Sequence, residues 1–116
     1  MATFQKKSFT TPDEKRTTPR ATTEIVKLGD KPVARVTYEP GWRWSEHVKP
    51  IVGTESCQVL HVGYVISGHM QVAVNDGTQA DFGPGDLVVI PPGHDGWVVG
   101  QEPCVFLDFG QTGIVK

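Results

Sequence analysis

Apolar and polar residues alternate in short stretches along most of the chain, and glycine and proline separate the stretches. Residues 32–40 show the pattern clearly, because Ala34, Val36 and Tyr38 fall on one face of an extended chain. The same alternation predicts further strands at 24–28, 42–48, 57–67, 69–74, 87–91, 97–100 and 103–109. No long window keeps an apolar stripe of helical period free of glycine or proline. We therefore expect an all-β protein.

Turn-forming residues separate the predicted strands. Asn75, Asp76 and Gly77 tolerate the backbone of a tight hairpin turn, and residues 82–86 and 91–96 are rich in glycine and proline. Residues 50–56 are expected to form a loop. The stretch 87–91 is wholly apolar, which is typical of a strand buried on both faces. Eight or nine short strands at this spacing predict a sandwich or a barrel.

Size and charge exclude several classes of protein. The chain has 116 residues, which is the size of one domain. Its net charge of −2 argues against binding of duplex nucleic acid, which requires a basic surface. No run of about 18 apolar residues could span a membrane, and no apolar segment follows the first lysines as in a secretory signal. Two cysteines, Cys57 and Cys104, are too few for a disulfide scaffold, so we expect free thiols in the cytoplasm.

The first 23 residues differ from the rest because they are polar, rich in threonine and positively charged. One interpretation of residues 1–23 is a flexible arm. The other is that Phe4 and Phe9 dock the arm onto a neighbouring subunit. Because symmetric dimers are the most frequent oligomers, we expect a homodimer whose partner contacts this arm or residues 24–28. The domain itself is expected to comprise residues 24–116.

Two segments carry glycines, prolines and histidines at characteristic spacings. These residues are Gly41 and His47, His61 and Gly68, and Gly85 with Pro91, Pro92 and Gly93. Together with the turns between them, residues 32–109 resemble a small single-domain cupin. The resemblance implies a double-stranded β-helix, or jelly roll, in which two sheets close around a cavity.

Cupins commonly hold a divalent metal in this cavity with three histidines and a glutamate. By the resemblance, His47 stands at the first histidine position and His61 at the glutamate position. Lys49 and Gly96 stand at the other two positions, and neither is a metal ligand in neutral solution.

His94 can restore the set of ligands. It lies two residues before Gly96 and therefore on the same face of an extended chain. We predict that His47, His61 and His94 bind Zn²⁺, Fe²⁺, Ni²⁺ or Cu²⁺. Each of them also has a structural explanation, as a rim residue, an interior residue and an exposed turn residue respectively.

Cys57 is a less favoured ligand at this stage. It precedes His61 by four residues, which corresponds to about 13 Å along a strand. Two ligands of one ion lie within about 4 Å of each other. Cys57 could therefore bind the same ion only if the strand began later than residue 57, and a small buried thiol is the simpler interpretation.

Other residues near the motifs indicate a second type of site. Lys49 and Arg43 could attract an anionic ligand, and Trp44 and Trp97 either pack in the core or line a pocket for a small molecule. Two functions follow from these observations. One is a metal-dependent enzyme with oxygenase-, hydrolase- or lyase-like chemistry, and the other is a non-catalytic module or sensor for an anionic or sugar-like ligand. The substrate and the catalytic residues stay open.

Overall fold

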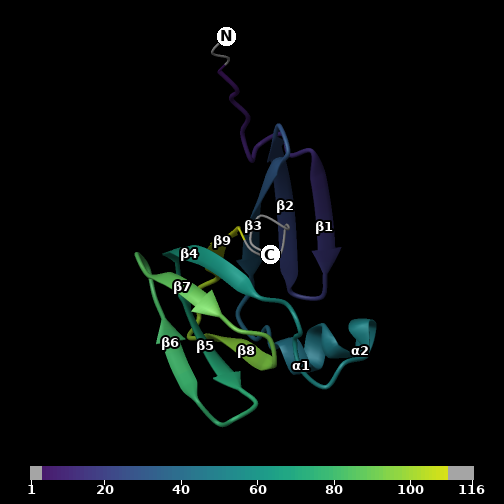
Figure 1. Ribbon diagram of the computed structural model, residues 1–116. Coiled ribbons are helices and arrows are strands. Elements are labelled where there is room, and N and C mark those ends of the chain that lie inside the picture. Colours follow the sequence, from purple (N-terminus) through teal and green to yellow (C-terminus); the bar gives the residue numbers. More distant parts are fainter. Residues whose placement is uncertain (1–3, 110–116) are drawn as a thin grey trace.

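The computed structural model describes residues 4–109, which form two antiparallel sheets (Figure 1). The larger sheet contains, in spatial order, β1 (Glu14–Thr18), β2 (Ala21–Leu28), β3 (Lys31–Tyr38), β9 (Cys104–Asp108), β4 (His61–Ser67) and β7 (Leu87–Ile90). The smaller sheet contains β6 (Gln79–Phe82), β5 (His69–Val74) and β8 (His94–Val99). This arrangement confirms the predicted all-β jelly roll.

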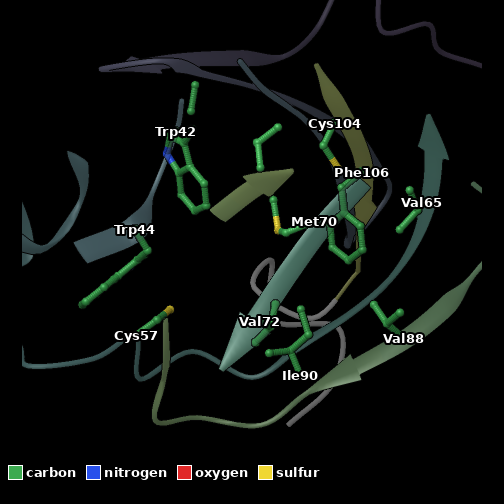
Figure 2. Packing of buried hydrophobic residues seen from close by; sticks show 12 residues of the cluster. Trp42, Trp44, Cys57, Val65, Met70, Val72, Val88, Ile90, Cys104 and Phe106 are labelled. Carbon is green, nitrogen blue, oxygen red and sulfur yellow. The ribbon is translucent and has the colours of Figure 1, made fainter. Parts of the chain in front are cut away.

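The hydrophobic core lies between the two sheets, as Figure 2 shows. Val36 of β3 lies opposite Phe106 of β9, and Phe106 lies opposite Val65 of β4. All of these side chains are buried. Val65 and Phe106 belong to one cluster with Met70 and Val72 of β5, whereas Val36 belongs to a second cluster with Ile25 and Ala34. In β3, β4, β5, β7, β8 and β9 the buried residues alternate along the strand, as the sequence pattern predicted for residues 32–40.

The segment before β4 differs from the prediction. Residues 42–48 were expected to form a strand, but the chain forms two short helices, α1 (Trp44–His47) and α2 (Lys49–Val52). Pro50 sits in the first turn of α2, where its missing N–H costs no hydrogen bond. Trp42 and Trp44 stand two residues apart, like neighbours on one face of a strand, and both are buried. The backbone nevertheless turns into a helix at Trp44. No helix within residues 4–109 is long and apolar enough to cross a membrane.

The boundary predicted at residue 23 does not separate an arm from the domain. β1 pairs along its whole length with β2, so residues 14–23 belong to the large sheet. Pro19 and Arg20 form the turn between these strands, and Arg20 adopts a φ of 59° there. Threonine-rich segments suit β-strands because of the branched side chain, which explains how such a polar segment is ordered. Docking of Phe4 and Phe9 on a partner stays a prediction.

The apolar strand β7 is buried on one face only, which corrects the prediction for residues 87–91. Val88 and Ile90 point into the core, whereas Leu87 and Val89 are 79% and 66% exposed. The reason is that β7 lies at the edge of the large sheet and its outer face carries no covering layer in the described chain. Tyr64 pairs with Leu87 across this exposed face.

Candidate metal centre

A cavity of about 440 Å³ lies between the sheets. Its walls are mainly apolar and aromatic, and one cysteine and two histidines gather in one part of the wall. Its lining includes Tyr38, Trp42, Trp44, Val65, Met70, Val72, Phe82, Ile90 and Phe106, together with Cys57, His61, His94 and Gly96. A cavity of this size suits a small organic molecule.

Cys57, His61 and His94 form one compact group, called here the CHH group. One donor atom from each residue lies within 4.8 Å of the other two. Sγ of Cys57 is 3.6 Å from Nε2 of His61, and the two imidazole rings are 5.1 Å apart between centroids. Cys57 and His94 are buried, and the side chain of His61 is 11% exposed.

Backbone hydrogen bonds between the strand ends position the group. His61 begins β4 and His94 begins β8, while Cys57 lies in the loop before β4. The N–H of Cys57 donates to the carbonyl of His94 over 2.8 Å, and the N–H of Gly93 donates to the carbonyl of Cys57 over 2.7 Å. Gly93 has a φ of 87°, which lets the chain turn sharply into β8. These contacts hold the thiol beside both rings.

Hydrogen bonds on the far side of each ring fix how the histidines face the cavity. Nδ1 of His94 lies 2.6 Å from the carbonyl oxygen of Pro91. A carbonyl can only accept, so Nδ1 carries the hydrogen and Nε2 of the neutral ring offers its lone pair. Nδ1 of His61 lies 2.6 Å from Oδ2 of Asp108 and carries a hydrogen as well, and Nε2 of His61 is the nitrogen that faces Cys57. Such partners are the usual support of metal-binding histidines.

The protonation of the CHH group is unusual. Burial raises the pKa of the Cys57 thiol, but hydrogen bonds to His61 and His94 outweigh burial and lower this pKa to about 6. Burial lowers the pKa of His61, but its hydrogen bonds to Asp108 and Cys57 raise this pKa to about 9. In neutral solution without metal, the pair is therefore a thiolate beside an imidazolium. A cation that replaces the proton on His61 would meet a negatively charged sulfur ligand.

The donor set fits a transition metal. Zinc bonds of about 2.0–2.3 Å place neighbouring ligand atoms about 3.3–3.8 Å apart, so small rotations of the side chains would close the group around an ion. One thiolate and two imidazoles suit zinc, iron, nickel or copper, whereas calcium and magnesium prefer oxygen. Three protein ligands also leave a position open for a substrate or water.

The structure brings together two of the three histidines that the sequence predicted. His47 lies in α1, and its Nδ1 atom lies 3.1 Å from the backbone carbonyl oxygen of Arg43. His47 is not among the donor atoms of the CHH group. The strand predicted at 42–48 would have carried it toward the cavity, whereas the helical turn directs its ring back to its own backbone.

The residues predicted to bind a ligand also lie in different places. Trp44 lines the cavity. Lys49, Arg43 and Trp97 are not part of the cavity lining. Nζ of Lys49 lies 3.1 Å from Glu55, and the guanidinium of Arg43 stacks over the ring of Trp97 at 4.3 Å.

Cys57 is a candidate ligand that the sequence pattern disfavoured. The estimate of about 13 Å assumed a strand from residue 57, but β4 begins at His61. The intervening loop folds back, and Cys57 forms a single bridge with His94 of β8 instead. The available signal was the pair itself, a cysteine and a histidine four residues apart next to a predicted turn.

Comparisons with known proteins agree with the architecture. Residues 39–105 match the family described as EutQ-like cupin domain. No curated protein sequence matches the chain. A protein of unknown function from Rhizobium leguminosarum bv. viciae 3841 has a similar structure, with a TM-score of 0.63 and 21% identity over 94% of this chain and 99% of that chain.

The structures of two named proteins are similar as well. KdgF from Halomonas sp. has a TM-score of 0.58 and 20% identity, covering 84% of this chain and 86% of its own. The polyketide cyclase RemF from Streptomyces resistomycificus has a TM-score of 0.63 and 19% identity, covering 91% of this chain and 78% of its own. At these identities the likeness concerns the fold. With the family match over more than half of its length, the chain belongs to the cupin superfamily, in the family of EutQ-like cupin domains.

Proposed function

We propose that this chain is a metal-dependent cupin enzyme that acts on a small organic molecule in the cavity between the sheets. The observation that carries this proposal is the CHH group with its two oriented rings. Asp108 and the Pro91 carbonyl hold the Nδ1 sides of the rings, which leaves the Nε2 atoms to bind an ion, and Nε2 of His61 lies 3.6 Å from Sγ of Cys57. Side chains that only fill a core need no such arrangement.

The residues around the group have separable roles. Cys57, His61 and His94 would hold the ion, which would act as a Lewis acid or activate water or dioxygen. Asp108 increases the basicity of His61 and fixes the ring that the ion would meet. The apolar walls exclude water from the space beside the group, which strengthens electrostatic effects there.

The lining also limits the type of reaction. Within the described residues, the cavity wall contains no aspartate or glutamate that could serve as a separate general base. Chemistry that depends on the ion itself therefore has more support than isomerisation by proton transfer. Oxygenase-, hydrolase- and lyase-like reactions belong to this class. The similarity to a polyketide cyclase shows that this architecture accommodates an enzyme.

The proposed site needs a reduced thiol, which favours the cytoplasm as the compartment. Oxidation of Cys57 would remove the negatively charged ligand and add bulk inside a buried group. Cytoplasmic thiols are kept reduced, whereas exported proteins meet oxidising conditions.

Elemental analysis of the purified protein tests the metal directly. Protein prepared under reducing conditions is expected to carry about one transition-metal ion per chain. A chelator should remove the ion, and added Zn²⁺ should restore it. The double variant Cys57→Ser/His94→Ala should lose it. The matched control Cys104→Ser/His69→Ala changes the same residue types outside the group and should keep it. A metal-free wild-type protein that also fails to bind added zinc would refute the proposal.

A non-catalytic binding module is the second candidate, and the same lining supports it. A cavity wall without a carboxylate base is also what a binding protein would show. Incubation of the metal-loaded protein with a mixture of small metabolites separates the two functions. An enzyme depletes one compound and produces another, and Cys57→Ser abolishes the change. A binding module retains a compound of unaltered mass.

A further inference from the structure

Gly96 lies on the inner face of β8, two residues after His94, and lines the cavity. Many glycines of this chain adopt a φ that other residues avoid, but Gly96 is not one of them. A Cβ atom at this position would meet its nearest neighbour, Val72, at 3.6 Å, which is ordinary contact. Neither the backbone conformation nor close packing therefore requires glycine here.

Another strand glycine shows the contrast. A Cβ atom on Gly63 would lie 2.1 Å from the carbonyl oxygen of Leu107, so packing excludes any side chain there. At Gly96, the missing side chain instead leaves space above Met70 and Val72 of the neighbouring strand. Because neither backbone conformation nor packing explains a glycine at position 96, we attribute it to the space that it adds to the cavity beside His94.

The chemistry of the walls indicates what this room accepts. Aromatic and aliphatic side chains make up most of the lining. Its polar side chains outside the CHH group are Thr18, Thr23, Thr54, Gln58 and Arg16, the one lysine, arginine, aspartate or glutamate in the described lining. The guanidinium of Arg16 lies 2.9 Å from Glu14 and is largely exposed. Tyr38 and Trp42 add a hydroxyl and an indole N–H, and this N–H is buried without a partner among the described residues, so the walls can serve a few polar atoms of a ligand. A sugar would bury most of its hydroxyls against these walls without hydrogen-bond partners, so a strongly polar molecule would bind poorly.

We propose that the substrate is an uncharged, predominantly apolar molecule with a ring system, which lies against the surface left open by Gly96. Gly96 then determines specificity by its size. Only the orientation of the molecule, with its polar end toward the CHH group, rests on the proposed function. The class of molecule rests on the walls of the cavity, because rings pack well against aromatic and methionine side chains.

A matched pair of fluorescent probes tests this class. N-phenyl-1-naphthylamine is neutral, and 8-anilino-1-naphthalenesulfonate has the same ring system with an added sulfonate. Titration of the wild-type protein is expected to give at least tenfold tighter binding of the neutral probe. Equal or tighter binding of the sulfonate would overturn the proposal, because it would show that the cavity selects an anion.

Variants at position 96 test where the neutral probe binds. Gly96→Leu should weaken its binding at least tenfold, because the side chain occupies the proposed space. Gly96→Ala adds only the Cβ atom that the structure accommodates, so it should fold normally and weaken binding by about threefold. Val99→Leu adds bulk to the exposed end of the same strand and should leave binding unchanged. Unchanged binding in both glycine variants would overturn the proposal.

Metal analysis of the same samples separates this inference from the proposed function. Tight binding of the neutral probe that depends on Gly96, in a protein that holds no metal, would refute the metal site and support the cavity assignment. A stoichiometric metal without binding of the neutral probe would support the metal site and refute the substrate class.

Discussion

Nδ1 of His61 lies 2.6 Å from Oδ2 of Asp108, whose side chain is completely buried. A buried carboxylate at this distance holds the ring in one orientation and increases the basicity of its other nitrogen. That nitrogen, Nε2, is the atom that faces Cys57. Asp108 of β9 thus supports the CHH group from the strand that neighbours β4 in the large sheet.

Asp108→Asn should lower zinc affinity about 10- to 100-fold, as loss of such a support usually does. The amide keeps the size of the side chain but removes the negative charge that favours the hydrogen on Nδ1. Calorimetric titration of metal-free protein measures the effect. Asp95→Asn is the control, because Asp95 accepts a hydrogen bond from the backbone of Ser45 and lies outside the CHH group. Equal affinities in both variants would show that Asp108 does not support a ligand.

The two cysteines should behave differently when changed to serine. Cys57→Ser should reduce zinc affinity at least tenfold, because a neutral hydroxyl replaces a thiolate. Cys104→Ser should leave zinc affinity near the wild-type value, because burial raises the pKa of Cys104 to about 11 and its thiol stays protonated. Competition with a chelating dye gives both affinities. A similar loss in the two variants would mean that the effect comes from packing.

Alkylation of metal-free protein should reveal the lowered pKa of Cys57. The thiolate is the reactive form, so the rate should rise as the pH increases through about 6 and level off near neutrality. An ordinary cysteine reaches its midpoint at about 8.5. Mass spectrometry after iodoacetamide treatment at a series of pH values follows the reaction.

Removal of the neighbouring imidazole provides the control for this measurement. His61→Asn eliminates one hydrogen bond that lowers the pKa of Cys57, so the midpoint should move upward. Bound zinc should protect the wild-type thiol. A wild-type midpoint near 8.5, unaffected by His61→Asn, would contradict the proposed thiolate–imidazolium pair.

Single histidine variants distinguish the ligand set of the structure from the set that the sequence suggested. His94→Ala should reduce bound zinc strongly, because it removes one of three donors. His47→Ala should retain bound zinc, because its ring contacts the backbone of Arg43 outside the group. Metal content after gel filtration measures both. Loss of zinc in both His47→Ala and His94→Ala would restore the original prediction, in which both histidines are ligands.

The strands with clear alternation were predictable from sequence, because inward and outward residues differ in polarity. The resemblance of residues 85–93 to the second cupin motif also placed His94 correctly beside the cavity. Alternation failed at residues 42–48, because Trp42 and Trp44 are both buried although Trp42 lies before α1 and only Trp44 belongs to its helical turn. In so short a segment, the period of two residues of a strand and the period of 3.6 residues of a helix cannot be distinguished from the sequence.

The site was only partly predictable for a related reason. The contact between Cys57 and His61 depends on where β4 begins, and strand boundaries depend on tertiary pairing rather than on local sequence. The role of Asp108 was hidden as well, because it comes from β9, 47 residues further along the chain. Such a contact follows from strand order, which the local pattern does not encode.

The homodimer was predicted to contact its partner through residues 1–23 or 24–28. The outer face of the large sheet is a second candidate interface, because Tyr64, Ile66, Leu87 and Val89 are exposed there. Light scattering at micromolar concentration should give twice the mass of the chain. The double variant Leu87→Lys/Val89→Lys should be monomeric if this face takes part, and Val99→Lys should not change the mass. A wild-type monomer would contradict the prediction.

Titration of the metal-free protein with Co²⁺ tests the central claim most directly, because a cobalt–thiolate bond gives a strong charge-transfer absorption in the near ultraviolet. We predict that this absorption grows until one equivalent of Co²⁺ is bound. It should be absent in Cys57→Ser and intact in Cys104→Ser. Cobalt binding without the absorption, or an absorption that persists in Cys57→Ser, would show that the CHH group is not the metal site.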